Sequence, residues 1–393
     1  TMSFSKFGRT IITNMGVVGR VNYDYQSKYL AEVSFRYDGS SKFAKGHRWG
    51  FFPSASVGYR ISEEKFIKEV DELSFITNWK LRASYGVMGD DGSSSYQYLS
   101  GYDYPGANYV FGDVVYKGLG FRGIPNELIT WYKSKTLNVG TDVELWNGLL
   151  SAQVDFFWRY RDGLLAKRNG EVPGTLGAEL PEENMNEDLY KGFEIVLGHR
   201  NKINDFNYSV NLNFALTRRL NRSLQEGDAV NSYDRWRNKY SNRYADMGWT
   251  YGSNGQFTSM DDIWHSPIQD GQGGATQLPG DWKYEDWNGD GIIDGNDVYP
   301  NTYEHSNDNG NPKMTFGATI TAEWKGFDVN LLFQGGGGFN VIYFEQLQYP
   351  LCFGGNGLAH FYDRYHQDES GNWIAGKWPT TRDAGSYGTN YAR

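Results

Sequence analysis

Twelve consecutive residues from Asp286 to Asp297 carry the most specific chemistry in this sequence. The segment DWNGDGIIDGND fits the pattern D-x-N-x-D-G-x-x-D-x-x-D. Side-chain oxygens at positions 1, 3, 5, 9 and 12 and a backbone carbonyl at position 7 are the donors that a hard cation such as Ca²⁺ requires, and glycine at position 6 permits the sharp turn. The predicted ligands are Asp286, Asn288, Asp290, the carbonyl of Ile292, Asp294 and Asp297.

The alternative for this segment is an Asp/Asn/Gly turn that holds no metal. Its twelfth position is Asp297 rather than glutamate, and the shorter side chain would bind an ion less tightly. No helical pattern flanks the segment, so we expect a calcium-binding-like loop at residues 280–300 within a longer connection. The ion would be structural, because it would neutralise four carboxylates and order a connection too long to order itself.

Other reactive residue types give weaker signals. Six histidines and 47 acidic residues suggest a hydrolase with paired carboxylates, but no GxSxG, HExxH or P-loop motif is present. Acidic side chains on the polar faces of predicted strands are explained by a solvated lumen; they are Glu32, Asp155, Glu194 and Glu323. We therefore expect no enzyme, and we assign no catalytic or cofactor-binding residue.

Aromatic residues are concentrated in the long connections, where ring faces could stack on sugars. Packing of the rings against one another or against a partner subunit is the simpler explanation for any one of them, so no binding site is assigned. These residues are Tyr102, Tyr104, Tyr109, Trp264, Trp282, Tyr343, Tyr349, Phe353, Trp373 and Trp378.

The long connections discussed above must be joined by regular elements, and the sequence predicts that these elements are amphipathic strands. Between residues 29 and 38, Val33 and Phe35 fall on one face, while Glu32 and Arg36 fall on the other. Residues 49–61 repeat this period of two after a Gly/Ser/Lys turn, which predicts an antiparallel hairpin. Because charged residues occupy the polar face in mid-strand, that face must meet water or a wet lumen.

The same alternation predicts about ten strands along the chain. They cover residues 14–25, 29–38, 49–61, 79–87, 136–145, 149–160, 190–199, 206–217, 314–324 and 327–334. A short helix is expected after the third strand, with Ser62 as N-cap and Phe66, Val70 and Leu73 at helical spacing. A connection of roughly forty residues, rich in Tyr and Gly, follows Val87, and a loop of about 25 residues precedes Tyr190. From Gly335 to Arg393 we expect irregular structure without strands.

The connections alternate between short and long. Short turns are predicted near Gln26, Asn147, Asp205 and Gly326, and strand parity places the long loops at the opposite end. This asymmetry is typical of outer-membrane barrels, whereas a soluble sandwich or propeller has mixed lengths at both ends. The predicted fold class is all-β: a transmembrane antiparallel β-barrel with long extracellular loops.

Composition excludes several classes of protein. Hydrophobic residues make up 39% of the chain and the mean hydropathy is -0.63; with no apolar run of eighteen residues, a helical membrane protein is excluded. A net charge of -9 without a Lys/Arg cluster argues against a nucleic-acid partner. The single cysteine, Cys352, rules out an intrachain disulfide and a Cys-based zinc site.

Five motifs resemble, in the same order, the barrel segments of SusC/RagA-type TonB-dependent transporters. They are DGSSKF from Asp38 with WGFFPSASVGYRISEEKF from Trp49, LRASYGVMGD from Leu81, NELITWYKSKTLNVGTD from Asn126, GDWKYEDWNGDGIIDGND from Gly280 and NPKMTFGATITAEWKGFDVNLLFQGGGG from Asn311. The resemblance covers nearly the whole chain. It implies nutrient uptake, of oligosaccharides or oligopeptides, through the outer membrane of Bacteroidetes-type bacteria. The implied partners are a SusD-like surface lipoprotein, TonB as energy source and outer-membrane lipid.

Transporters of that family also have a signal peptide, a TonB box, a plug and about 22 strands. The resemblance therefore implies that residues 1–393 are a segment, of about ten strands, of a larger plugged barrel, and that the plug, the TonB box and the terminal strands are absent from it. The alternative is a soluble, calcium-stabilised β-protein that binds or hydrolyses carbohydrate. The two differ in where one set of residues lies, towards lipid or in a core: Tyr29, Val33, Phe35, Leu81, Tyr85, Val154, Phe156 and Phe214.

Overall fold

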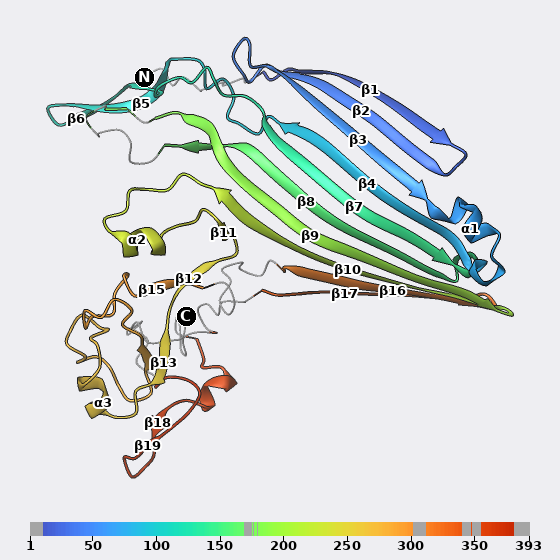
Figure 1. Ribbon diagram of the computed structural model, residues 1–393. Coiled ribbons are helices and arrows are strands. Elements are labelled where there is room, and N and C mark those ends of the chain that lie inside the picture. The colour runs from blue at the N-terminus through green and yellow to red at the C-terminus, as the bar shows by residue number, and fades with distance from the viewer. Residues whose placement is uncertain are drawn as a thin grey trace. The chain divides into compact units, whose positions relative to one another are not determined.

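The computed structural model describes residues 11–168, 175, 177, 178, 180–301, 312–339, 347 and 355–380 (Figure 1). The chain divides into two compact units. The first is Thr1–Ala245 with Lys313–Gly337, and the second is Asp246–Pro312 with Gly338–Arg393. Tyr343, Tyr349, Cys352 and Phe353 lie outside the described residues.

The first unit is a curved antiparallel sheet in which neighbours along the chain are mostly neighbours in space (Figure 1). Its main path runs through β1 (Asn14–Tyr25), β2 (Tyr29–Ser40), β3 (Trp49–Arg60), β4 (Ile76–Asp90), β7 (Tyr132–Leu145), β8 (Leu150–Lys167), β9 (Glu182–Ile203), β10 (Phe206–Ser223), β16 (Met314–Trp324) and β17 (Phe327–Gly337). A short strand, β11 (Arg243–Tyr244), also pairs with β10. The ten predicted strands are thereby confirmed among the described residues.

The four predicted short turns lie at one end of this sheet, as Figure 1 shows. In the first, Gln26 and Ser27 both have positive φ, 56° and 54°, which suits the right-handed twist of a hairpin. The carboxylate of Asp24 accepts a hydrogen bond of 2.7 Å from the amide of Ser27 and holds the turn closed. The predicted topology is confirmed.

Three connections of this sheet differ in detail from those predicted. β8 continues to Lys167 and β9 begins at Glu182, so the loop between them is shorter than the predicted 25 residues. The connection after β4 contains a hairpin of β5 (Tyr102–Phe111) and β6 (Val114–Phe121). The helix after β3 breaks into η1 (Ile61–Glu63), α1 (Lys65–Lys68) and η2 (Asp71–Leu73).

Ser62 is not the predicted N-cap of this helical segment. Glu64 precedes α1 without a side-chain capping bond, and the buried hydroxyl of Ser62 has no hydrogen-bond partner. Ile67 is the buried residue of α1, whereas Phe66 is exposed. The predicted apolar face of Phe66, Val70 and Leu73 is therefore wrong, because the helix is too short to present one.

Very little of this sheet is a conventional core. A buried cluster of Phe43, Phe52, Ile129 and Trp131 lies near the loop end, and Val87 and Leu165 pack against it. The indole of Trp131 donates a 2.9 Å hydrogen bond to the carbonyl of Arg48. This cluster ties the loop after β2 to the segment that precedes β7.

The second unit contains short two-stranded antiparallel pairs. They are β12 (Gly248–Tyr251) with β15 (Val298–Asn301), β13 (Ser253–Gln256) with β14 (Trp282–Tyr284), and β18 (His366–Gln367) with β19 (Trp373–Ile374). The last pair corrects the prediction that no strands follow Gly335. The helix α3 (Met260–Trp264) buries Ile263 in this unit, while α2 (Ser232–Arg237) belongs to the first unit. Among the described helices, none has the length and apolarity to cross a membrane.

Candidate functional site

The predicted calcium-binding-like loop lies in the second unit, between β14 and β15. Gly289 and Gly291 have φ values of +75° and +82°, a conformation that side-chain-bearing residues rarely adopt. The two oxygens of Asp286 accept hydrogen bonds of 2.7 Å and 2.8 Å from the amides of these glycines. The first acid of the motif therefore organises the turn in which it lies.

The last acid of the motif closes the loop. Asp297 is fully buried, and its oxygens accept from the amides of Trp287, at 2.9 Å, and Asp294, at 2.8 Å. A buried carboxylate needs such donors to offset the loss of hydration. The side chains at both ends of the motif are thus engaged with the backbone of the loop itself.

The remaining predicted ligands lie on the exposed side of the loop. Asn288 donates a 2.8 Å hydrogen bond to Asp290, and Asp294 accepts one of 2.6 Å from the amide of Asn296. Ile292 forms an isolated parallel bridge with Ile268. Within the described part of the chain, no three His, Cys, Asp or Glu side chains are grouped so that they could hold one metal ion. The calcium ligand set stays a prediction.

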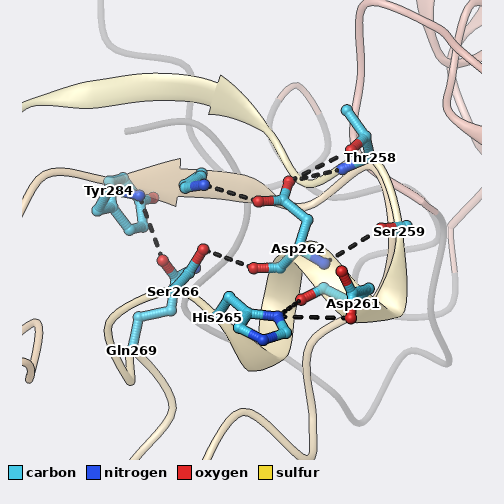
Figure 2. A network of polar contacts seen from close by, with 9 residues as sticks. Thr258, Ser259, Asp261, Asp262, His265, Ser266, Gln269 and Tyr284 are labelled. Atoms are coloured by element: carbon cyan, nitrogen blue, oxygen red, sulfur yellow. Dashed lines mark hydrogen bonds and ion pairs between the residues drawn. The ribbon is translucent and has the colours of Figure 1, made fainter.

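A polar network anchors the segment that precedes this loop (Figure 2). Asp262 on α3 accepts a 2.7 Å hydrogen bond from the ammonium of Lys283 on β14 and one of 3.1 Å from the amide of Thr258. The hydrogen bond from Lys283 lowers the pKa of Asp262 more than burial raises it. The side chain of Gln269 accepts from the amide of Tyr284 at 3.2 Å, beside the same strand.

The loop aromatics differ in their surroundings. Tyr102, Tyr104, Tyr109 and Trp264 are exposed, whereas Trp373 packs against Tyr365 and Trp378 against His360 and Phe361. Packing of rings against one another within the loops therefore accounts for Trp373 and Trp378.

The two faces of the sheet have opposite chemistry. Cα-paired residues such as Val33 and Ala55, Phe156 and Phe193, or Leu212 and Ala318 continue one apolar face from strand to strand. Six of the eight residues that distinguish lipid contact from a core are exposed, including Val33 at 59%, and the other two, Val154 and Phe214, are half-buried. A soluble protein would bury these side chains, so the structure does not support the soluble alternative.

Aromatic residues, including a histidine, border this apolar face at the short-turn end. Tyr29 stacks on Tyr59 with centroids 5.4 Å apart, and His199 forms a 2.9 Å hydrogen bond with the hydroxyl of Tyr208. At the loop end, Tyr37 stacks on Trp49 at 4.8 Å. Such rings with polar groups favour the two interfaces of a membrane.

The polar face carries a charged cluster that the sequence analysis did not identify. Arg82 on β4 contacts Asp142 on β7, with Nε to Oδ1 at 3.0 Å, and Asp155 on β8, with Nη2 to Oδ2 at 2.6 Å. All three lie at polar positions of adjacent strands in which apolar and polar residues alternate. Their alternation was visible in the sequence, but the register that brings them together was not.

Comparison with known proteins agrees with the antiparallel sheet described above. A family model described as "TonB dependent receptor-like, beta-barrel" matches residues 3–231. The TonB-dependent receptor P3 of Formosa agariphila is 30% identical over 351 residues, which are 88% of this chain and 33% of that protein. The TonB-dependent receptor SusC of Bacteroides thetaiotaomicron is 29% identical over 299 residues, which are 73% of this chain and 28% of that protein.

Solved structures share the fold. The chain superposes on a chain of the RagAB peptide transporter with a TM-score of 0.62 and 20% identity, over 82% of this chain and 33% of the other. The chain thus spans about a third of the length of the relatives that it matches.

Proposed function

Because the chain belongs to the TonB-dependent receptor-like β-barrel family, we propose that it forms part of the wall of a nutrient importer. The chain is part of an outer-membrane protein, and its large antiparallel sheet is a segment of a membrane-spanning barrel. Import by the complete receptor is the function that this segment would serve.

The observation that carries the proposal is the division of the sheet into two faces. Apolar residues such as Val33, Leu81 and Phe156 stay exposed on one side, which suits lipid tails. The other side carries hydroxyls, amides and the Arg82 cluster. A wall with these two faces separates lipid from a wet lumen through which a polar solute could pass.

We infer that the transported solutes are oligosaccharides or oligopeptides. The name of the RagAB peptide transporter, whose fold the chain shares, supports oligopeptides, and the resemblance of the sequence motifs to SusC/RagA-type transporters supports both classes. The same similarity supports a SusD-like lipoprotein partner and energy supply by TonB, through parts of the receptor outside this sequence. No catalytic step is required, since the relatives are named as receptors and transporters.

Uptake by intact cells tests the proposal. Cells that lack the gene of the complete receptor should fail to accumulate one class of labelled oligosaccharide or oligopeptide, and the restored gene should recover uptake. Loss of TonB should abolish the recovered uptake. Uptake of every tested oligosaccharide and oligopeptide that is equal with and without the receptor would contradict the importer function.

The loop at residues 280–300 has a separate proposed role as a structural Ca²⁺ site. Its support is the spacing of Asp286, Asn288, Asp290, Asp294 and Asp297, with the carbonyl of Ile292 as an extra donor. Bound Ca²⁺ would supply positive charge among four carboxylates. It would hold the segment between β14 and β15 in one conformation.

A further inference from the structure

Three residues on neighbouring strands form a row on the polar face of the sheet. Tyr190 on β9 is the Cα partner of both Arg159 on β8 and Arg219 on β10. Side chains alternate between faces along a strand, so Arg159 shares its face with Asp155, which Arg82 holds. The polar face therefore presents two guanidinium groups with a phenol between them.

The row lies towards the end of the sheet that carries the long loops. β10 runs from Phe206 at its short turn to Ser223, and Arg219 lies near the second of these ends. On β8, Arg159 is closer to the loop end than Asp155 is. A solute that enters the lumen from the loop side would meet this row before it met the Arg82 cluster.

A third arginine holds the phenol in place. Nε of Arg161 donates a 2.8 Å hydrogen bond to one oxygen of Asp188, and its Nη2 contacts the other. Nη2 also donates a 3.2 Å hydrogen bond to the hydroxyl of Tyr190, and the guanidinium carbon is 4.9 Å from the centroid of that ring. Because the hydroxyl accepts from Arg161, its own proton is available to an acceptor in the row.

The two outer arginines of the row are not neutralised as Arg161 is. The side chains of Arg159 and Arg219 are exposed, and among the described residues no carboxylate forms an ion pair with either. On the same face, Asp188 and Asp155 are each held by another arginine. The excess positive charge on this part of the face is therefore concentrated at the two ends of the row.

The spacing of the row suits one small anion. Neighbouring strands lie about 4.8 Å apart, so the Cα atoms of Arg159 and Arg219 are about 10 Å apart, and two long arginine side chains can close on one group between them. Guanidinium groups bind carboxylates with paired N–H donors, and the hydroxyl of Tyr190 adds a further donor.

We propose that Arg159, Tyr190 and Arg219 bind a carboxylate of the imported solute, so that the importer selects acidic over neutral oligosaccharides or oligopeptides. The site would act at the loop side of the lumen, before the solute passes farther along the wall. This inference rests on the proposed import function and adds to it the charge of the solute.

Uptake of matched probes by cells that carry the complete receptor tests this assignment. The probes are a labelled oligopeptide with glutamate residues and its glutamine counterpart, and a labelled oligogalacturonate and its methyl ester. Two exposed ion pairs, each worth up to about fivefold in affinity, predict a KM about 10-fold lower for the acidic member of the imported class. The Arg159→Gln/Arg219→Gln variant should show equal KM values for the two members, and the class that responds identifies the source of the carboxylate.

Lys133→Gln/Lys191→Gln is the matched control, because it also removes two positive charges but from the opposite face. Lys191 is the residue after Tyr190 on β9, and Lys133 on β7 is the Cα partner of Asp162, the residue after Arg161. This variant should keep the preference for the acidic probe.

The outcomes separate this inference from the import function. Receptor-dependent uptake with equal KM values for acidic and neutral probes would overturn the inference alone. Uptake of all four probes that is the same with and without the receptor would overturn the import function together with it. A preference that survives in the arginine variant, or that the lysine variant loses to the same extent, would also overturn the inference.

Discussion

The guanidinium of Arg82 on β4 reaches across β7 and holds Asp155 on β8 with two hydrogen bonds, Nη1 to Oδ1 at 2.7 Å and Nη2 to Oδ2 at 2.6 Å. The same guanidinium contacts Asp142 on β7. Arg82→Met would leave two neighbouring carboxylates without their shared cation. We expect a loss of about 1–3 kcal/mol in the free energy of unfolding of the complete barrel, measured by denaturant titration in detergent.

Arg20→Gln provides the comparison for this variant. Arg20 pairs with Glu32 at 3.4 Å on the same face, but its side chain is largely exposed, so its loss should cost well under 1 kcal/mol. Equal effects of the two variants would show that the Arg82 cluster contributes no more than a surface ion pair.

A charged side chain on the apolar face should destabilise the folded barrel strongly, whereas a charged side chain at the next residue, on the opposite face, should destabilise it little. Val33 is exposed midway along β2, whereas Ser34 faces the other side and shares a 2.6 Å hydrogen bond with Ser54. Val33→Arg should destabilise the folded barrel in lipid vesicles by about 2–4 kcal/mol. Ser34→Arg should have a far smaller effect, and similar costs at both positions would mean that Val33 does not face lipid.

The alternation of residue types was sufficient to predict the membrane-facing parts of the ten strands. β1 has the predicted bounds, and β10 starts where predicted, because apolar and polar positions alternate there without interruption. The upper part of β9, from Glu182 to Asp188, was missed, since both of its faces are polar once the strand leaves the apolar band. Alternation reports the solvent on each face, and it disappears where both faces meet water.

The β5–β6 hairpin was missed for the opposite reason. Val110 and Phe111 are adjacent and both exposed, as are Val114 and Val115 across the turn, so apolar residues occupy both faces near its tip. Pro105 and a register shift between Asp103 and Ala107 further interrupt the pattern. Period-two analysis has no means of recognising such a strand pair.

Acid should loosen the turn that follows Gln269. Burial alone would raise the pKa of Asp270, but the amides of Thr276, Gln272 and Gly274 outweigh it and lower the pKa from 3.8 to about 2. A carboxyl with a depressed pKa stabilises the folded state above its unfolded pKa, and this stability is lost as the pH falls from about 4 to 2. The expected loss is about 1–2 kcal/mol after solvent screening.

Hydrogen exchange measured by mass spectrometry would detect this change. Residues 270–277 should be protected at pH 5 and lose protection near pH 2.5, after correction for the intrinsic rate of exchange. Asp270→Asn should lack the protection at both values. A segment that stays protected at pH 2.5 would show that the carboxylate form of Asp270 is not what holds the turn.

Removal of Ca²⁺ should loosen the loop at residues 280–300 and leave the strands intact. Without the ion, the carboxylates of Asp286, Asp290 and Asp294 would repel one another, so a chelator should increase proteolysis within the loop. Asp290→Ala should reproduce the effect, and added Ca²⁺ should reverse only the effect of the chelator.

Asp368→Ala is a suitable control for the chelation experiment. Its carboxylate accepts hydrogen bonds from the amides of Ser370 and Asn372 in a different turn, so cleavage of residues 280–300 should respond to Ca²⁺ as in the unmodified protein. Proteolysis unaffected by both the chelator and Asp290→Ala would leave the motif as a turn without metal.

The sequence was less informative about side-chain partners than about strands. It identified Asp286 and Asp297 as important in one loop, and both do organise that loop, but through backbone amides that no residue pattern specifies. The Arg82–Asp155 contact depends on the order and register of three strands. Both kinds of contact require knowledge of the folded backbone.

Spin-label accessibility along the sheet tests the central claim most directly. With Cys352 replaced by serine in the complete receptor, single cysteines would carry nitroxides at Val33 and Ser34, Val139 and Asn138, and Leu212 and Asn213. The account predicts that the first of each pair collides with oxygen dissolved in lipid and the second with a water-soluble nickel chelate. Equal accessibility within the pairs, or chelate access at Val33, Val139 and Leu212, would contradict a wall between lipid and lumen.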